Sequence, residues 1–136
     1  MDLMNTIMIA ASGLRAQSGR MRVISENLAN ANSSAQEPGG DPYRRRISTF
    51  QSEFERELGA YTVRLGNIRF DDQPFEKHHE PGHPAADANG YVKLPNINPL
   101  VEMMDIREAQ RSYEANLNVV QSARSMAVRT IDILRS

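Results

Sequence analysis

The 136-residue chain has no cysteine and no tryptophan, and aromatic residues make up only 6% of it. The absence of cysteine excludes thiol catalysis and disulfide bonds. Because bulky side chains are so few, long aliphatic seams between helices suit this composition better than a deep globular core. The formal net charge is −1, which gives no overall field to attract nucleic acid or an anionic membrane. We therefore expect neither a nucleic-acid partner nor direct membrane insertion.

Long apolar runs and catalytic motifs are also missing. The longest apolar run, residues 7–11, is far too short to span a bilayer. The N-terminus has Asp2 in place of a basic leader, and its helical pattern continues past Arg20, so we expect any export to proceed without a cleaved signal peptide. No nucleotide-binding glycine loop, serine elbow or paired-carboxylate arrangement appears. These absences predict a protein that is not an enzyme and uses no cofactor.

The C-terminal stretch, residues 98–136, has the clearest pattern in the chain. Asn98 is a good helix cap, and Pro99 occupies the first helical position, where its missing N–H costs nothing. No glycine or proline follows, so the helix could extend roughly 55 Å at 1.5 Å per residue. Apolar residues recur at three- and four-residue steps along one stripe. A helix this long in so short a chain needs a partner surface, either within the chain or on another molecule.

The N-terminal stretch, residues 1–31, predicts a second long helix. Apolar residues alternate steps of four and three along a heptad seam, and the only polar residue in the seam is Gln17. Gly13 and Gly19 in the interior should each cost about 1 kcal/mol relative to alanine. We expect a helix that becomes ordered by packing, with a partner backbone close to those glycines. A plain amphipathic helix in a bundle is the alternative.

The residues between the helices predict small β elements and loops. Residues 30–42 have turn composition and end the first helix. The next stretch, residues 44–46, is three arginines, for which a solvated or interfacial strand edge is favoured over phosphate contacts. Residues 47–58 fit either a helix or a strand. Residues 61–70 alternate as a strand with a bulge at Gly66 and a turn near Asp71, and Asn89-Gly90 precedes a short strand at residues 91–94.

A cluster of histidines and carboxylates occupies residues 76–87 and is the only part of the chain that resembles a chemical site. His78, His79 and His83 invite a zinc or iron interpretation. Their spacing matches no established metal motif, since the helical pair of histidines with a neighbouring glutamate is absent. The prolines and glycines around them predict an irregular, polar surface loop. We therefore expect no metal site.

Taken together, the patterns predict a mainly α fold. Two long terminal helices would form a coiled-coil-like pair, with a small β-containing or irregular middle segment. The corresponding domains are residues 1–33 together with 98–136 as one terminal-helix domain, and residues 34–97 as the middle segment.

Two stretches resemble a known family. SGLRAQSGRMRVISENLANANS at residues 12–33 resembles the N-terminal signature shared by the flagellar axial proteins, which are the rod, hook and hook-associated subunits. GHPAADANGYVKLPNINPLVEMMDIREAQRSYEANLNVV at residues 82–120 is similar, more specifically, to the C-type flagellar basal-body rod proteins of the proximal rod. The resemblance covers nearly the whole chain. It is weaker over residues 34–40 and 51–80.

The resemblance implies a structural subunit of the periplasmic rod, which transmits torque. Such subunits leave the cell through the flagellar type III export apparatus and assemble with copies of themselves, with other rod subunits and with the membrane-ring or export-gate adapter at the rod base. In the family, the terminal helices pack into a tube around the export channel. Here the implied assembly residues are the two apolar stripes: Leu3, Ile7, Leu14, Met21, Ile24, Leu28, Ile106, Ala109, Tyr113, Leu117, Val120, Ala127, Ile131 and Leu134. The implied family turn motif contains Asn27, Asn30 and Asn32.

Two other functions remain open from the residues alone. A soluble helical-hairpin adaptor would pair the same two helices within one monomer and form no filament. A small metal-binding enzyme would use His78, His79 and His83 as ligands, and elemental analysis finding no stoichiometric metal would remove it.

Overall fold

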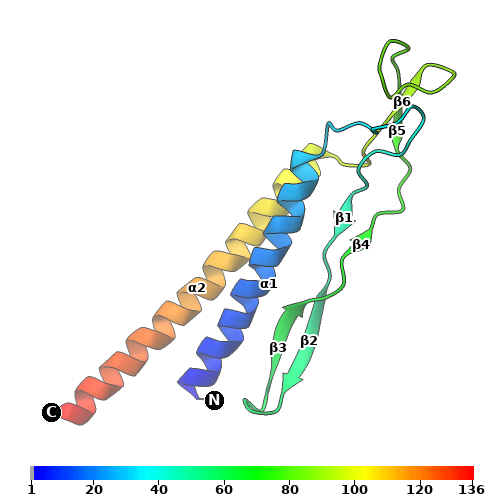
Figure 1. The fold of residues 1–136 in the computed structure, drawn as a ribbon. Coiled ribbons are helices and arrows are strands. Elements are labelled where there is room, and N and C mark those ends of the chain that lie inside the picture. Colours follow the sequence, from blue (N-terminus) through cyan, green and yellow to red (C-terminus); the bar gives the residue numbers. More distant parts are fainter. Residues whose placement is uncertain (1) are drawn as a thin grey trace. The chain divides into compact units, whose positions relative to one another are not determined.

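A computed structural model describes residues 2–136 as two helices and three two-stranded antiparallel sheets (Figure 1). The chain divides into two compact units. Unit 1 comprises Met1–Met21, Thr49–Asn67 and Arg107–Ser136, and unit 2 comprises Arg22–Ser48 and Ile68–Ile106. Each unit therefore takes part of both helices and part of the middle segment. The domain division expected from the sequence stays a prediction.

Both predicted helices are confirmed. Helix α1 spans Leu3–Ala29 and α2 spans Pro99–Arg135, and at 27 and 37 residues they account for nearly half of the chain. The side chain of Asn98 caps α2 by accepting a hydrogen bond from the backbone N–H of Leu100 at 3.1 Å. No helix within residues 2–136 has the length and apolar character needed to cross a membrane. The mainly α prediction is confirmed in this coarse form, whereas coiled-coil pairing of the helices stays a prediction.

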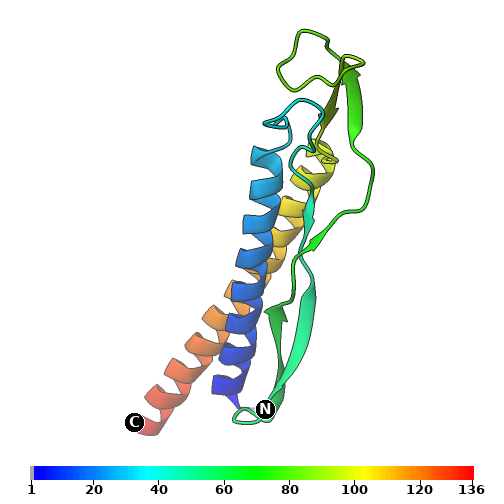
Figure 2. The same cartoon turned by 45° about the vertical axis from the view of Figure 1, so that its right-hand side comes forward.

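In unit 1, a β-hairpin packs against the first part of α1 (Figure 2). Strand β2, Phe50–Glu55, pairs with β3, Ala60–Leu65, and Gly59 at a φ of 61° closes the turn. The Ser12 hydroxyl oxygen accepts the Val63 backbone N–H at 3.2 Å. At Gly19, a side chain would collide with Leu65, because an added Cβ would lie 2.9 Å from that leucine's methyl carbon. The sheet is thereby fixed in register against the helix.

The two helices also touch in unit 1. Gly13 leaves room for the Asn116 side chain of α2, whose amide nitrogen would lie 2.8 Å from an added Cβ. Arg20 forms a salt bridge with Glu108 at 3.5 Å. The sequence predicted a close approach at Gly13 and Gly19, and it is present. The groups that fill the space are the side chains of Asn116 and Leu65, not the backbone of a partner.

Unit 2 contains the other two sheets. Strand β1, Arg46–Ile47, pairs with β4, Arg69–Phe70, and strand β5, Glu76–His79, pairs with β6, Tyr91–Leu94. The strand predicted at residues 91–94 after the Asn89-Gly90 turn is confirmed, and Gly90 has a φ of +83° there. The buried apolar residues of the unit other than proline are Val23, Ile24, Ala85, Val92 and Ile97.

Two predictions for the middle segment are wrong. The hairpin turn is not near Asp71 but between β2 and β3, because residues 50–55 form the partner strand that the sequence left ambiguous. The bulge predicted at Gly66, in contrast, is supported by the pairing: Phe50 pairs with Leu65 and Ile47 with Arg69, so three residues between β3 and β4 lie opposite two between β1 and β2. The second wrong prediction concerns residues 76–79, which were expected in an irregular loop and form strand β5.

Asp87 holds the turn between β5 and β6. Its carboxylate accepts the backbone N–H groups of Asn89 and Tyr91, each at 2.9 Å. The hydrogen bond from Tyr91, followed by those from Asn89 and Gly90, lowers the pKa of Asp87 below its usual value. A lowered native pKa means that the bonds stabilise the fold above the ordinary aspartate pKa and are lost as the pH falls through the native one.

Replacing Asp87 with alanine should therefore loosen this turn at neutral pH. The expected result is faster amide exchange at Tyr91 and Gly90 in the variant at pH 7, and a smaller difference from the parent protein as the pH falls below the native pKa. Asn89→Ala is the matched control, since its side chain makes no bond in this turn among the hydrogen bonds of the described chain. Equal exchange in both variants would contradict a role for the carboxylate.

Candidate functional site

A polar cluster in unit 2 joins the end of α1 to β1. The Asn27 side chain donates through its amide nitrogen to the Arg46 carbonyl oxygen at 2.8 Å and accepts the Arg46 backbone N–H at 3.0 Å. Asn27 therefore bonds both backbone groups of one strand residue, as a neighbouring strand would. Its nitrogen also lies 3.4 Å from a Glu102 carboxylate oxygen. With an exposed fraction of only 1%, Asn27 is held from several sides.

The same cluster contains a buried ion pair. Glu102, in the first turns of α2, is fully buried and bonded to the guanidinium of Arg45. Arg45 also reaches Asp71 at 3.2 Å and Asp105 at 3.6 Å, and its backbone N–H donates to Asn96 at 2.8 Å. We call Asn27, Arg45, Asp71 and Glu102 the clasp. It links α1, the segment before β1, the segment after β4 and α2 within unit 2.

Charge explains how Arg45 tolerates this position. Burial alone would lower the pKa of Arg45, but the hydrogen bonds and negative charges of Glu102 and Asp71 outweigh burial and raise it above its usual value. The guanidinium therefore stays protonated throughout the physiological range. Its forked donors satisfy two carboxylates at once, which a lysine could not match.

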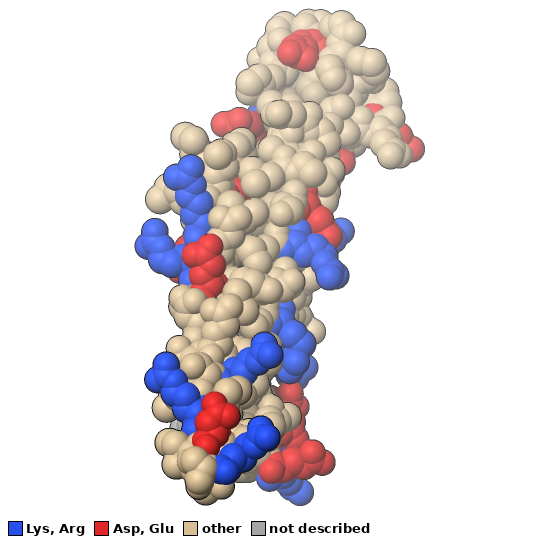
Figure 3. Space-filling model, turned by 90° about the vertical axis from the view of Figure 1, so that its left-hand side faces the viewer, with Lys and Arg blue, Asp and Glu red and all other residues tan. Residues whose placement is uncertain are grey.

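The other two arginines of the triplet are also engaged within the chain. Arg44 donates to the carbonyl oxygens of Asp71 and Gln73 at 2.8 and 3.2 Å and lies 4.2 Å from the centre of the Phe75 ring. Arg46 pairs with Glu26 at 3.5 Å. The interpretation of residues 44–46 as a solvated or interfacial strand edge is thus incomplete, because Arg45 is an internal ion-pair partner. Figure 3 shows cationic and anionic side chains interspersed on one face of the molecule.

The predicted assembly residues are unevenly covered. Ile24 and Ala109 are buried, at 5% and 0% exposure, whereas Leu117, Ile131 and Leu134 are exposed at 37%, 54% and 80%. The remaining predicted residues are half-buried: Leu3, Ile7, Leu14, Met21, Leu28, Ile106, Tyr113, Val120 and Ala127. The stripe on α2 is therefore most open toward its C-terminal end. An assembly role for these positions stays a prediction.

The asparagines of the family turn motif have separate places. Asn27 lies within α1, as part of the clasp, and Asn30 and Asn32 follow the helix in the turn. The Asn30 amide donates to the Glu26 carbonyl oxygen at 2.8 Å and so closes the last turn of α1. Asn32 is exposed.

The three histidines do not converge. His78 and His79 are neighbours on β5, so their side chains point to opposite faces, and the His79 ring packs edge-on against Tyr91 at 5.0 Å. His83 Nδ1 accepts the Ala85 backbone N–H at 3.0 Å. Within residues 2–136, no group of three histidine or carboxylate side chains is placed to hold a metal ion.

Comparison with known proteins gives consistent matches along the chain. Residues 7–34 match the family "Flagella basal body rod protein", and residues 88–133 match "Flagellar basal body rod FlgEFG protein C-terminal". The chain is 49% identical to flagellar basal-body rod protein FlgC of Agrobacterium fabrum, over 94% of this chain and 92% of the relative. It is 40% identical to FlgC of Salmonella typhimurium over 98% of both chains. Its identity with FlgC of Bacillus subtilis is 34%, over 98% of this chain and 99% of the relative.

Proposed function

The chain belongs to the FlgC family of flagellar basal-body rod proteins, and we propose that its terminal helices build it into the rod by packing against neighbouring subunits. It is a structural subunit of the basal-body rod. The family membership therefore selects the rod subunit among the three functions that the sequence patterns alone left open. The apolar stripes of α1 and α2 would supply the contacts. The tube formed in this way would surround the export channel and transmit torque.

The finer parts of this function follow from the same membership. Other copies of this chain, other rod subunits and the adapter at the rod base would be the neighbours. The subunit would reach the periplasmic rod through the flagellar type III export apparatus, without a cleaved signal peptide. Its relatives are named as rod proteins, and we propose a purely structural, non-enzymatic role.

The observation that carries the assembly proposal is the contrast between the buried residues of the two units. Unit 2 buries the larger side chains of Val23, Ile24, Val92 and Ile97. The buried residues of unit 1 other than glycine are Ala10, Ser12, Ala16, Ala109 and Ala123, all of them small. Small side chains bury little apolar area, which is the main stabilising contribution to a folded unit. Large apolar residues of unit 1, such as Met126, Ile131 and Leu134, remain exposed and would become buried on neighbouring subunits.

Hydrogen exchange on dilute, freshly purified monomer tests this proposal. We expect fast exchange over residues 3–21 and 107–135, and protection over residues 22–29, 99–106 and the β5–β6 hairpin. The boundary within each helix should thus follow the division between the units. Strong protection along both whole helices would contradict the assembly proposal, since the helices would already bury each other in the monomer.

A further inference from the structure

The polarity of the first turns of α2 is inverted with respect to solvent. Glu102 is 0% exposed, whereas four apolar neighbours in the same stretch are between 44% and 72% exposed: Leu100, Val101, Met103 and Met104. Leu100 and Met104 are four residues apart and lie on the side of the helix opposite Glu102. A soluble helix ordinarily covers its apolar side and leaves its carboxylates in water. Rotating this segment about its own axis would restore that usual arrangement.

The clasp opposes this rotation. One carboxylate oxygen of Glu102 is bonded to the Arg45 guanidinium, and the other lies 3.4 Å from the Asn27 amide nitrogen. Arg45 also reaches Asp105 at 3.6 Å, and Asp105 follows one turn further along α2 on the same side as Glu102. Turning Glu102 into water would separate both carboxylates from the cation. The ion pair and the exposed apolar residues therefore favour opposite rotations of the same segment.

Asn27 gives Glu102 a fixed partner within unit 2. Its amide oxygen accepts the Arg46 backbone N–H at 3.0 Å and the Tyr43 hydroxyl at 3.4 Å. Its amide nitrogen donates to the Arg46 carbonyl oxygen at 2.8 Å and to Glu102 at 3.4 Å. These four bonds use both hydrogens and both lone pairs of the amide, so the group is saturated. Because Asn27 is also only 1% exposed, it cannot follow Glu102 if α2 turns.

We propose that Glu102 is a positioning residue: its pairing with Arg45 fixes the rotation of residues 99–106 about the axis of α2, and the subunit needs this rotation to assemble. The inference rests on the proposed function and adds the residue that keeps Leu100 and Met104 on the outside of unit 2. Apolar side chains held in contact with solvent are typical of a surface that becomes covered in an assembly. The pair thus contributes specificity rather than stability, a role that buried charges have in some proteins.

Arg45→Met combined with Glu102→Leu tests the inference, because it makes residues 100–104 apolar on every side and removes the preference for one rotation. The monomer should keep a urea midpoint close to that of the parent protein, whereas rods in basal bodies purified from cells carrying only this variant should be about ten-fold fewer. A midpoint as low as that of Arg45→Met alone would overturn the inference, because the pair would then serve stability. Normal rod numbers would also overturn it.

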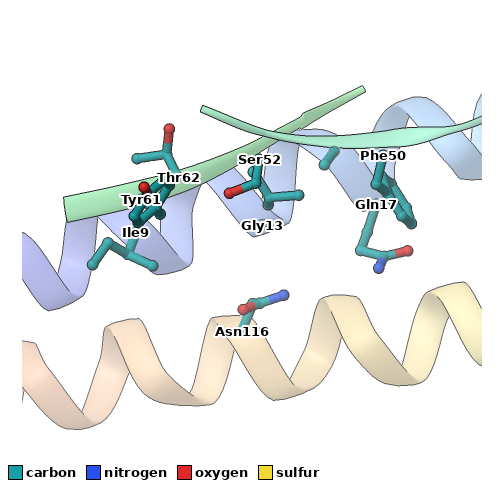
Figure 4. Close-up of a pocket in the computed structure, with 10 residues that line it drawn as sticks. Ile9, Gly13, Gln17, Phe50, Ser52, Tyr61, Thr62 and Asn116 are labelled. Atoms are coloured by element: carbon teal, nitrogen blue, oxygen red, sulfur yellow. The ribbon is translucent and has the colours of Figure 1, made fainter. Parts of the chain in front are cut away.

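Arg64→Met combined with Glu53→Leu is the matched control. It makes the same two substitutions in an ion pair of 3.1 Å whose side chains are 58% and 57% exposed. Glu53 is paired with Thr62, and Figure 4 shows the Thr62 side chain directed away from Asn116 of α2. Cross-strand partners share a face of the hairpin, so this pair lies on the face away from α2. The control should keep its rods, and an equal loss would overturn the inference, since apolar substitution as such would then be the cause.

Thiol labelling measures the rotation in the monomer, because the chain has no cysteine of its own. With Met104→Cys alone, iodoacetamide should alkylate the folded protein about as fast as the urea-unfolded protein, since position 104 is 71% exposed. With Arg45→Met and Glu102→Leu added, alkylation should be about five-fold slower, because covering positions 100 and 104 together buries more apolar area than covering position 102. An unchanged rate would overturn the inference.

Glu102→Gln is the conservative variant, because it keeps an acceptor for Arg45 at the same side-chain length. It should retain fast labelling at position 104 and most of the rods. Loss of rods while labelling stays fast would overturn the inference, since the charge and not the rotation would then be required.

The outcomes separate this inference from the proposed function. Unchanged labelling in a variant that still enters rods would overturn the positioning role and leave the rod assignment intact. Absence of the parental protein from purified basal bodies would instead overturn the proposed function, whatever the labelling of the monomer shows.

Discussion

Replacing Arg45 with methionine is expected to destabilise the isolated protein by about 3 kcal/mol, near the lower end of the cost of breaking a buried ion pair. The substitution leaves the Glu102 carboxylate at 0% exposure with no cation beside it, and it also removes the side-chain bond to Asp71. The loss should appear as a lower urea midpoint at pH 7, followed by circular dichroism. Unit 2 should lose its exchange protection first, because the clasp joins four of its segments.

Two further variants separate the clasp from ordinary surface charge. Arg64→Met removes an exposed pair with Glu53, whose side chains are 58% and 57% exposed, and should cost at most about 1 kcal/mol. The double variant Arg45→Met with Glu102→Leu removes both charges and should recover most of the stability, since apolar replacement of a buried pair is often neutral or favourable. Equal losses for Arg45→Met and Arg64→Met would mean that the clasp is not closed in solution.

The helices were predictable from the sequence because their signals are local. The Asn98-Pro99 start, the uninterrupted stretch to Ser136 and the heptad spacing of α1 each lie within a few turns of chain. The β2–β3 hairpin was only half predictable. Residues 60–65 alternate clearly, but their partner strand β2 contains Ser52 and Glu53, and its spacing of apolar residues also fits a helix. Pairing with β3 and packing on α1, which are contacts from elsewhere in the chain, decide between the two.

The clasp could not be predicted, because its members are far apart in sequence. Arg45 lies 26 residues from Asp71 and 57 from Glu102, and no spacing rule connects them. The sequence made the arginine triplet conspicuous, but it did not indicate which of the three would be internal. Asn27 was singled out by family resemblance alone, whereas its two bonds to the Arg46 backbone are visible only in the folded chain. Gln17, in contrast, was visible from the start as the exception in an apolar seam.

The apolar stripes therefore combine positions with two kinds of role. Some positions on each stripe are already covered in the single chain, such as Ile24 and Ala109, and substitutions there should act on the fold. Other positions, such as Leu117, are exposed, and substitutions there should affect assembly alone. The periodicity treats both kinds alike, because it records which side of a helix is apolar and not what covers that side.

Leu117→Asp is accordingly expected to abolish motility while leaving the monomer's free energy of unfolding within about 0.5 kcal/mol of the parent protein's, the usual range for exposed substitutions. A carboxylate placed in an apolar subunit contact would have to be desolvated without a partner, so rods should not assemble.

Ile24→Asp should also abolish motility, but with a destabilised monomer, because Ile24 is 5% exposed. Soft-agar swimming and counts of purified basal bodies measure the first effect, and urea unfolding measures the second. Ser122→Asp is the matched control, because it adds the same charge at an exposed polar position on another side of α2, and it should leave motility largely intact. Motile cells carrying Leu117→Asp would remove this part of α2 from the assembly interface.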